Sequence, residues 1–352
     1  MKKKKYEILT EEIFSYIKTK DVGSMLPPES KMLELFKASR NTYRTAIDLL
    51  KKDGILDSKA GLGTTILSLT KQERSIKLIQ AILPSKGNAF WYSILEGINE
   101  TLLGSGYRLL FTNSHDDPKL NQQQIDGLLA AGIDGLLLIA DYKSFQDYDL
   151  RNLANFPPMV MIDNCPDHYE GHFVSTNDEE GAYILTKKLI DQGHKKILHI
   201  GGFNCFTLRS RRMGYLKAMN EAFLDIDISS QVGITFRDGY EFGQNYLAQN
   251  TQLPDAVFGA NDFVTLGFCK ACEDAGISIP EDISVVGYAN VRSEMYKRGI
   301  FLTTMDQNPE KIGSKAAELL LEDLKSDSRT KASRELLPVQ YIDNKSTREK
   351  ST

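Results

Sequence analysis

The order of apolar and polar residues changes character near residue 70. Before that point, apolar residues recur at helical spacing in short segments, and the stretch closes on short apolar runs around two glycines. From about residue 75 to about 343, apolar runs of strand length alternate with amphipathic segments of helical length. This change predicts two folding units of different architecture.

Three helices are predicted in the first unit, at 6–20, 29–36 and 40–53, because their apolar residues fall on one helical face. Two prolines separate the first helix from the second. Ser39 is expected to cap the third helix at its amino end, and Gly54 is expected to end it. The unit therefore begins as a small helical domain.

A β-hairpin is predicted after the third helix, because apolar residues alternate around Gly61 and Gly63. Helix, short helix, helix and hairpin in this order make a winged helix-turn-helix, whose third helix enters the major groove of DNA. The charge distribution fits this interpretation. Residues 1–70 hold 11 Lys and two Arg against nine acids, a net charge of +4, while the remaining 282 residues carry −8.

The amino end of the third helix carries side chains suited to DNA. Arg40 and Arg44 are four residues apart on one face, from which guanidinium groups can reach phosphates or guanine edges. Ser39, Asn41 and Thr42 supply short polar contacts beside them. This set favours a DNA-reading helix over a domain used only for protein contacts.

The first unit closely resembles the GntR family of bacterial repressors, through "LPPES" (26–30), "SRNTYR" (39–44), "LLKKDGIL" (49–56) and "AGLGT" (60–64). Two positions depart from the family pattern. Ser30 replaces a usually basic residue, beside Lys31, and Lys37 occupies a turn position that is usually glycine. The resemblance implies DNA contacts at the positions of Glu29, Arg40, Asn41, Arg44 and Gly61. With the neighbouring polar residues, the predicted DNA-binding set is Glu29, Lys31, Ser39, Arg40, Asn41, Thr42, Arg44 and Gly61.

The second unit is predicted to be α/β, with parallel sheets flanked by helices in two successive lobes. Its expected elements include a helix near 144–155 and a strand near 231–236. Two similar lobes imply a small-molecule site between them. The expected domains are a winged helix-turn-helix (1–70), a linker (71–75), a two-lobed core for effector binding and dimerisation (76–343) and a disordered tail (344–352).

The second unit resembles the effector-binding core of the LacI family, which is related to periplasmic sugar-binding proteins. The similarity lies in "IDGLLLI" (133–139), "GHKKILHIGG" (193–202), "RRMGY" (211–215), "GANDFVTLG" (259–267), "GISIPEDISVVGYAN" (276–290) and "LTTMDQNPEKIG" (302–313). The chain is therefore identified as a GntR-type head on a LacI-type core. The resemblance implies a homodimeric transcription regulator, expected to be a repressor, that binds roughly palindromic operator DNA and senses a sugar or sugar derivative.

Candidate effector-binding residues stand at predicted strand-to-helix junctions, beyond the carboxyl ends of the strands. Trp91 would stack on a sugar or base, with core packing as the alternative. Asp163 would accept sugar hydroxyls, with helix capping or solvation as the alternative, and Arg211 would offer forked donors. The LacI resemblance implies pocket positions at Trp91, Thr207, Arg211 and Asn261. The full predicted set is Trp91, Asp163, Thr207, Arg211, Phe236, Asn261 and Ala289.

Ala289 is the departure that bears on ligand choice. The family usually has an aspartate at this position, which grips the effector from the second lobe. Its absence suggests that the effector differs from a common hexose, or that it is anionic, because removing a carboxylate removes repulsion. Both are hypotheses.

Other functional classes receive little support from the sequence. No apolar run is long enough to span a membrane, and the amino-terminal lysines are not followed by the apolar stretch of a signal peptide, so a cytoplasmic protein is expected. Cys269 and Cys272 form a single CxxC without a second pair, so neither a metal nor another cofactor is predicted. The alternative is an α/β enzyme acting on a sugar or nucleotide, but the sequence contains no phosphate-binding glycine motif and no recognisable catalytic triad order. No catalytic residue is therefore assigned.

Overall fold

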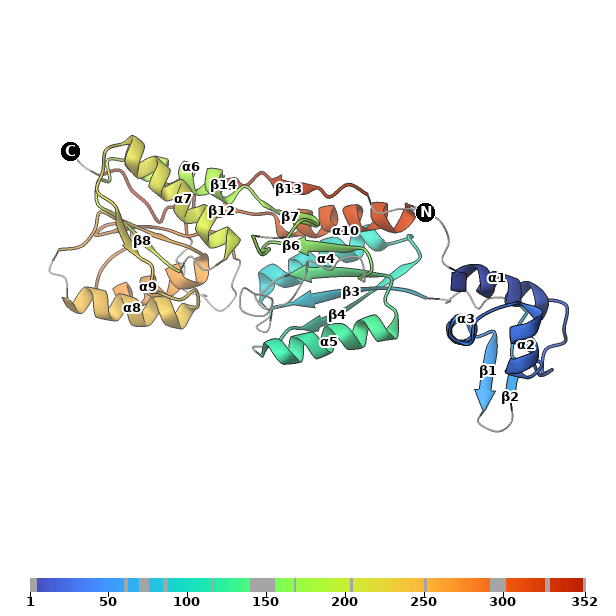
Figure 1. Ribbon diagram of the computed structural model, residues 1–352. Helices are drawn as coiled ribbons and strands as arrows, with labels where there is room; N and C mark the ends of the chain where they lie inside the picture. Colours follow the sequence, from blue (N-terminus) through green and yellow to red (C-terminus); the bar gives the residue numbers. More distant parts are fainter. Residues whose placement is uncertain are drawn as a thin grey trace. The chain divides into compact units, whose positions relative to one another are not determined.

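A computed structural model shows the architecture of the chain (Figure 1). The structure describes residues 5–59, 63–69, 76–84, 88–115, 117–139, 156–167, 169–202, 205–249, 252–291, 302–326 and 330–350. Contacts divide the chain into two compact units, Met1–Ile76 and Lys77–Thr352, here called the head and the core. Among the described helices, none combines the length and the apolar character needed to cross a membrane.

The head contains the three predicted helices and the predicted hairpin. The helices are α1 (Lys5–Ile17), α2 (Glu29–Leu35) and α3 (Arg40–Lys52), and the strands β1 (Leu56–Lys59) and β2 (Gly63–Ile66) pair in antiparallel fashion. One apolar cluster holds these elements together, because each helix turns one face inward. Its fully buried members include Ile13, Ile17, Met32, Ala46, Leu50, Ile55 and Ile66.

The core contains two parallel sheets covered by helices on both faces, as predicted. The sheet of the first lobe has the order β13-β7-β6-β5-β3-β4, with α4 and α10 on one face and α5 on the other (Figure 1). Its strands are β3 (Lys77–Leu83), β4 (Tyr107–Asn113), β5 (Gly135–Ile139), β6 (Met159–Ile162), β7 (His172–Thr176) and β13 (Arg334–Leu337), and its helices are α4 (Ala89–Leu102), α5 (Pro118–Ala131) and α10 (Pro309–Lys325).

The sheet of the second lobe has the order β11-β10-β8-β9. Helices α6 and α7 pack on one face, and α8 and α9 pack on the other. The elements are α6 (Asp178–Asp191), β8 (Ile197–Ile200), α7 (Phe206–Glu221), β9 (Asp227–Ser229), α8 (Phe236–Gln249), β10 (Ala256–Gly259), α9 (Asp262–Asp274) and β11 (Ser284–Val286).

The chain passes between the lobes at three places, here called the crossover connections. They lead from β7 into α6, from β12 (Thr304–Asp306) into α10, and from β13 into β14 (Gln340–Ile342), which pairs with β12. The Asn177 N–H donates to the Leu337 carbonyl at 2.8 Å, which ties the first connection to the third. The sequence pattern did not predict β7, β12, β13 or β14.

The predicted strand at 231–236 is wrong. The strand, β9, ends at Ser229, and Phe236 instead begins α8. The misleading signal was the alternation of Val232, Ile234 and Phe236. A capping box decides the outcome: the Thr235 N–H donates to Asp238 Oδ2 at 2.8 Å, and the Asp238 N–H donates to Thr235 Oγ1 at 3.2 Å.

The predicted disordered tail is also wrong for residues 344–350, which lie against the second lobe. Ser346 is buried, and its Oγ and carbonyl form hydrogen bonds with the Val285 carbonyl and N–H. Lys350 Nζ contacts Asp255 Oδ1 at 2.6 Å. These bonds satisfy backbone groups on the outer strand β11, so the segment is part of the fold. The predicted linker at 71–75 and the predicted helix near 144–155 lie outside the described residues.

Candidate functional site

The amino end of α3 presents the polar side chains that the sequence predicted for DNA binding. Ser39 caps the helix by accepting a hydrogen bond from the Thr42 N–H, which confirms its predicted capping role. Tyr43, Ala46, Ile47 and Leu50 anchor the opposite face in the head core. Asn41 and Lys31 are exposed, whereas Gly61 lies outside the described residues.

Glu29 brings the two arginines of α3 together. Its Oε1 atom lies 3.4 Å from Arg40 Nε and 3.4 Å from Arg44 Nε. Both arginines stay largely accessible, with 70% and 63% of their side chains exposed. An exposed ion pair is worth little in water, so these guanidinium groups remain available to a polyanion.

The turn between α2 and α3 contains an unusual residue. Lys37 has a φ of 48°, in the left-handed region that glycine ordinarily occupies. The Ala38 N–H donates to the Leu33 carbonyl at 3.1 Å, and the Lys37 N–H donates to the Glu34 carbonyl at 3.3 Å. This pair of bonds is a Schellman motif. Lysine in place of the usual glycine therefore preserves the turn, but the left-handed backbone of Lys37 is strained.

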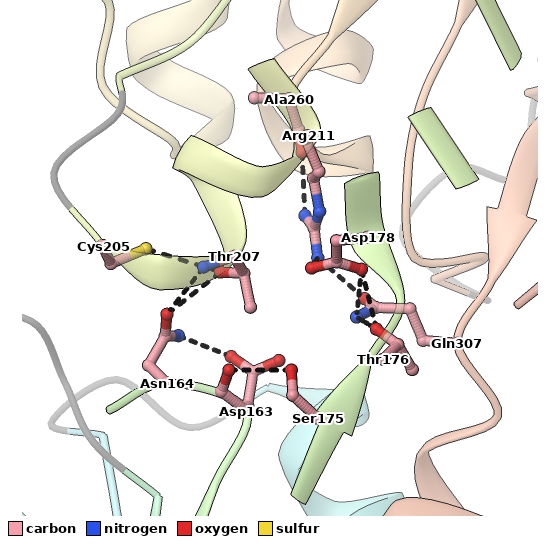
Figure 2. Close-up of polar contacts among 10 residues, drawn as sticks. All are labelled: Asp163, Asn164, Ser175, Thr176, Asp178, Cys205, Thr207, Arg211, Ala260 and Gln307. Carbon is pink, nitrogen blue, oxygen red and sulfur yellow. Dashed lines mark hydrogen bonds and ion pairs between the residues drawn. The ribbon is translucent and has the colours of Figure 1, made fainter. Parts of the chain in front are cut away.

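In the core, polar residues from both lobes meet beyond the carboxyl ends of β6 and β8 (Figure 2). Asp163 and Asn164 follow β6, and Thr207 lies in the first turn of α7. Asn164 Oδ1 accepts hydrogen bonds from both the N–H and the Oγ1 of Thr207, each at 3.1 Å. Asn164 Nδ2 donates to Asp163 Oδ2 at 2.6 Å. One amide therefore links the two lobes and a buried carboxylate.

Arg211 lies in the same cluster, but other protein groups occupy its terminal nitrogens (Figure 2). Its Nη2 atom is 3.2 Å from Asp178 Oδ2 and 3.1 Å from Gln307 Oε1, and its Nη1 atom donates to the Ala260 carbonyl at 2.8 Å. Its guanidinium group also stacks over the Tyr288 ring at 4.1 Å. Arg211 thus joins α7 to two crossover connections, through Asp178 and Gln307.

Burial dominates the electrostatics of the cluster. It raises the pKa of Asp163 to about 7, a shift that Arg211 opposes and Asp178 reinforces. Burial also raises the pKa of Asp178, although Arg211 and the Thr176 hydroxyl stabilise its charged form. Asp163 has a φ of 66°, so its backbone occupies the left-handed region as well. Perturbed carboxylates and backbone strain gathered at one place are typical of a binding site.

Trp91 and Ala289 pack against the same apolar cluster of the first lobe. Trp91 lies in the first turn of α4, where its N–H donates to the capping Asn88 side chain. Ala289 has a φ of 117°, and its N–H donates to the Met305 carbonyl at 2.9 Å. The amide of the neighbouring Asn290 donates to Asp306 Oδ2 at 2.9 Å. An apolar contact therefore stands where the resemblance led us to expect a carboxylate.

Asn261 and Phe236 have local partners in the second lobe. Asn261 caps α9 by accepting from the Val264 N–H at 2.9 Å, and it donates to the Ile234 carbonyl at 3.0 Å. Phe236 stacks on Tyr240 with ring centroids 6.4 Å apart. Of the predicted effector set, Asp163 and Thr207 are joined through hydrogen bonds to Asn164, and Arg211 interacts electrostatically with Asp163.

Sequence reasoning missed Asp178, Gln307, Thr176 and Asn164. Gln307 Nε2 donates to Thr176 Oγ1 at 2.8 Å, and the Thr176 hydroxyl donates to Asp178 Oδ1 at 2.7 Å. A signal existed for Gln307, which lies within the "LTTMDQNPEKIG" segment used for the family resemblance. Asp178 resembles an ordinary acidic residue at a helix start, and only the fold shows that Arg211 faces it.

Comparisons with known proteins agree with this division into two units. Residues 6–66 match the gntR family of bacterial regulatory proteins, and residues 186–347 match the periplasmic binding protein-like domain. In the core, a LacI-family transcriptional regulatory protein from Corynebacterium glutamicum superposes with a TM-score of 0.64 at 25% identity, over 78% of this chain and 99% of that one. These matches define a transcription regulator with a DNA-binding head and a ligand-binding core.

The family follows from a closer relative. The chain is 34% identical over 271 residues to the HTH-type transcriptional repressor PurR of Pasteurella multocida, which covers 76% of this chain and 80% of the relative. The PurR repressor of Haemophilus influenzae is 32% identical over 249 residues, covering 70% and 73%. The chain therefore belongs to the LacI/PurR family of transcriptional repressors, with a gntR-type head. It is a regulator that binds operator DNA and responds to a small molecule, and it is not an enzyme.

Proposed function

We propose that this regulator binds a roughly palindromic operator as a homodimer and that its effector is a sugar or sugar derivative bound between the lobes of the core. The observation that carries the proposal is the pair of hydrogen bonds from Thr207 to Asn164, beside the buried Asp163. A ligand hydroxyl at this place would contact both lobes at once. Effector binding would then favour one arrangement of the lobes over others.

For the DNA contacts, we propose the exposed face of α2 and α3, together with the wing. Arg40 and Arg44 would contact phosphates or guanine edges, and Glu29 would hold the two guanidinium groups in place until DNA replaces it. We place the head at 1–70, the linker at 71–75 and the core from 76 through 350. The proposed contact set is Glu29, Lys31, Ser39, Arg40, Asn41, Thr42, Arg44 and Gly61.

For the effector, we propose contacts from both lobes: Trp91, Asp163 and Asn164 from the first, and Thr207 and Ala289 from the second. Relatives of similar fold support the ligand class. The LacI family regulator of Enterococcus faecium holds ribose, with a TM-score of 0.68 and 24% identity over 78% of this chain and all of that one. The CcpA regulator of Weissella paramesenteroides holds sucrose.

For dimerisation, we propose the edge of the first-lobe sheet. Strand β4 is the last strand in the sheet order, so one row of its backbone groups is unpaired within the described sheet. Leu110 and Phe111 on this strand are exposed, as is Leu103 just before it. A second copy related by a two-fold axis would cover these side chains. The Leu110→Lys variant should sediment as a monomer, and a variant that stays dimeric would rule out this interface.

Linked measurements of DNA binding and effector binding test the whole proposal. Duplexes selected from a randomised pool by the full chain would identify an operator, whose affinity is then measured by fluorescence anisotropy. A thermal-shift screen of sugars, sugar acids, sugar phosphates and nucleobases would identify the effector, since a bound ligand raises the Tm by mass action. The effector should change operator affinity by the same factor by which operator DNA changes effector affinity. A pool from which no duplex is enriched would contradict the function.

A further inference from the structure

The polar cluster of the core contains more buried carboxylates than buried cations. Asp163, Asp178 and Arg211 are all almost completely buried. If all three are ionised, they carry a net charge of −1. A buried charge without a partner is costly, so this excess needs compensation from within the protein or from a ligand.

Arg211 lowers the pKa of Asp163 through its charge, but its ion pair is with Asp178, and one guanidinium group balances only one of the two carboxylates. Its terminal nitrogens contact Asp178, Gln307 and the Ala260 carbonyl, and its flat face lies on Tyr288. One guanidinium group therefore matches one carboxylate, Asp178. Turning it toward Asp163, or toward an anionic ligand, would leave Asp178 buried and unpaired.

Asp163 receives little help from the other groups around it. In the part of the chain that the structure describes, the one hydrogen-bond donor to its carboxylate is the neutral amide of Asn164. The thiol of Cys205 and the phenol of Tyr288 interact with it electrostatically. Burial raises the pKa of both groups, so both stay uncharged at neutral pH. Among the described residues, Arg211 forms its ion pair with Asp178, so Asp163 is the carboxylate of the cluster that lacks an ion-pair partner.

This balance bears on the hypothesis of an anionic effector, which arose from the missing carboxylate at position 289. A sugar acid or sugar phosphate would add a second negative charge beside Asp163, while the charge of Arg211 is already paired with that of Asp178. Ala289 itself packs against the apolar cluster that Trp91 contacts. Without an aspartate at position 289, the surface there is apolar. The carboxylate that an effector would meet is therefore that of Asp163.

We propose that the effector carries a protonated amine, as amino sugars do, and that this ammonium group pairs with the carboxylate of Asp163. The pairing restores neutrality to the cluster without disturbing the contact between Arg211 and Asp178. The ring of the sugar would lie toward Trp91 and Ala289, where an apolar face is favoured. This inference rests on the proposed function, since it names the chemical class of effector for the same site.

Matched sugars test the inference. Glucosamine, glucose and glucuronate differ at one substituent each, and galactosamine, galactose and galacturonate form a second series. Binding to the full chain would be measured by isothermal titration and by thermal shift. We expect at least one amino sugar to bind about tenfold or more tightly than its neutral partner, the size of one favourable charge contact, and the acid to bind more weakly than both.

The Asp163→Asn variant tests whether the preference for an amine depends on the carboxylate of Asp163. Asparagine keeps an acceptor for Asn164 and tolerates the left-handed backbone of this position, so the fold should persist. In this variant the preference for the amine should fall to within about twofold of the neutral sugar. The matched control is Asp167→Asn, which removes an exposed carboxylate beside Arg209 and should keep the preference. If Asp163→Asn fails to fold, the wild-type sugar series alone decides.

Three results would overturn the inference: equal binding of the amine and the neutral sugar, tighter binding of the acid, or no binding by either series. The proposed function is judged separately through DNA. If the chain still selects an operator and another compound shifts its Tm, the regulator stands and only the amine is wrong. If no operator is selected, the proposed function itself fails.

Discussion

In the head, Arg40 and Arg44 lie 3.4 Å from Glu29 and remain mostly exposed, whereas in the core Arg211 lies 3.2 Å from Asp178 with both side chains buried. The two contacts use the same chemical groups at nearly the same distance. Their surroundings differ, and because the surroundings set the strength of an ion pair, the energy needed to break each contact differs too. Water competes for the head contact, but it scarcely reaches the core contact.

The difference shows which arginines are free to bind something else. A guanidinium group that water can solvate leaves its carboxylate at little cost, so a phosphate can take over from Glu29. When a buried guanidinium group leaves its carboxylate, the carboxylate remains in the interior as an unpaired charge, which is energetically costly. The head arginines are therefore suited to contact DNA, and Arg211 is suited to hold the crossover connections together.

Arg211→Ala should have the largest effect, because it leaves Asp178 buried without its cation. We expect a loss of about 3–5 kcal/mol in the free energy of unfolding, measured by urea denaturation of the core transition. Arg209→Ala is the matched control, since Arg209 pairs with Asp167 at the surface and should cost less than about 1 kcal/mol. If Arg211→Ala were as stable as wild type, the buried ion pair would contribute no more to stability than the exposed ion pairs of the head.

Asp163 should make the stability of the core depend on pH. Its pKa is about 7 in the folded chain and about 3.9 when unfolded, so between these values the folded state binds more protons. The free energy of unfolding should then decrease as the pH rises from about 4 to 7, by up to about 1.4 kcal/mol per pH unit.

Asp163→Asn should remove this slope, and the difference between variant and wild type isolates it from other titrating groups. Asp262, whose pKa burial raises to about 6, contributes in the same direction in both proteins. Parallel stability curves for the two proteins between pH 4 and 7 would show that Asp163 is not desolvated, which would weaken the contrast with the exposed Glu29.

Arg44→Ala should weaken operator binding while leaving the melting temperature of the head almost unchanged. The loss should be about 1–3 kcal/mol if Arg44 reads a base, or a decrease of about one in the salt slope if it contacts a phosphate. Anisotropy titrations at several salt concentrations distinguish the two. Arg237→Ala, at an exposed ion pair of the core, is the control. Unchanged DNA affinity in the Arg44 variant would contradict the role of α3.

Lys37→Gly should have the smallest effect and the opposite sign. Glycine adopts the left-handed backbone of this turn without strain, so the head should gain about 1 kcal/mol of stability. Because the turn connects the helix of Glu29 to that of Arg40 and Arg44, operator affinity should not fall. Calorimetry of the head transition measures the gain. Destabilisation would mean that the Lys37 side chain makes a contact worth more than the strain.

The sequence predicted the head almost completely, because its helices and hairpin are local patterns with recognisable caps such as Ser39. It predicted the alternation of strands and helices in the core for the same reason. The strands it missed, β7, β12, β13 and β14, have three to five residues each and take their identity from distant partners. Local periodicity carries no information about such pairing.

The candidate site was predicted in part. Asp163 was predicted from its place at the end of a strand, Thr207 and Arg211 were predicted from the family resemblance, and the structure brings the three into one cluster. What the sequence could not provide is the state of each side chain: that Arg211 is occupied by Asp178, and that Asn164 connects the lobes. Buried charge pairs depend on tertiary neighbours, so a motif can place an arginine but not say whether its donors are free.

The position of β13 and Ser346 late in the sequence has a consequence for the synthesis of the protein. Strand β13 forms one outer strand of the first-lobe sheet, and Ser346 covers β11, one outer strand of the second. Both lobes therefore receive their last hydrogen-bonding partner from the carboxyl-terminal end. During translation the head can fold early, since its contacts are local, but the two lobes lack these partners until β13 and Ser346 have been synthesised. A nascent chain would thus hold a folded DNA-binding head before it holds a complete sensor.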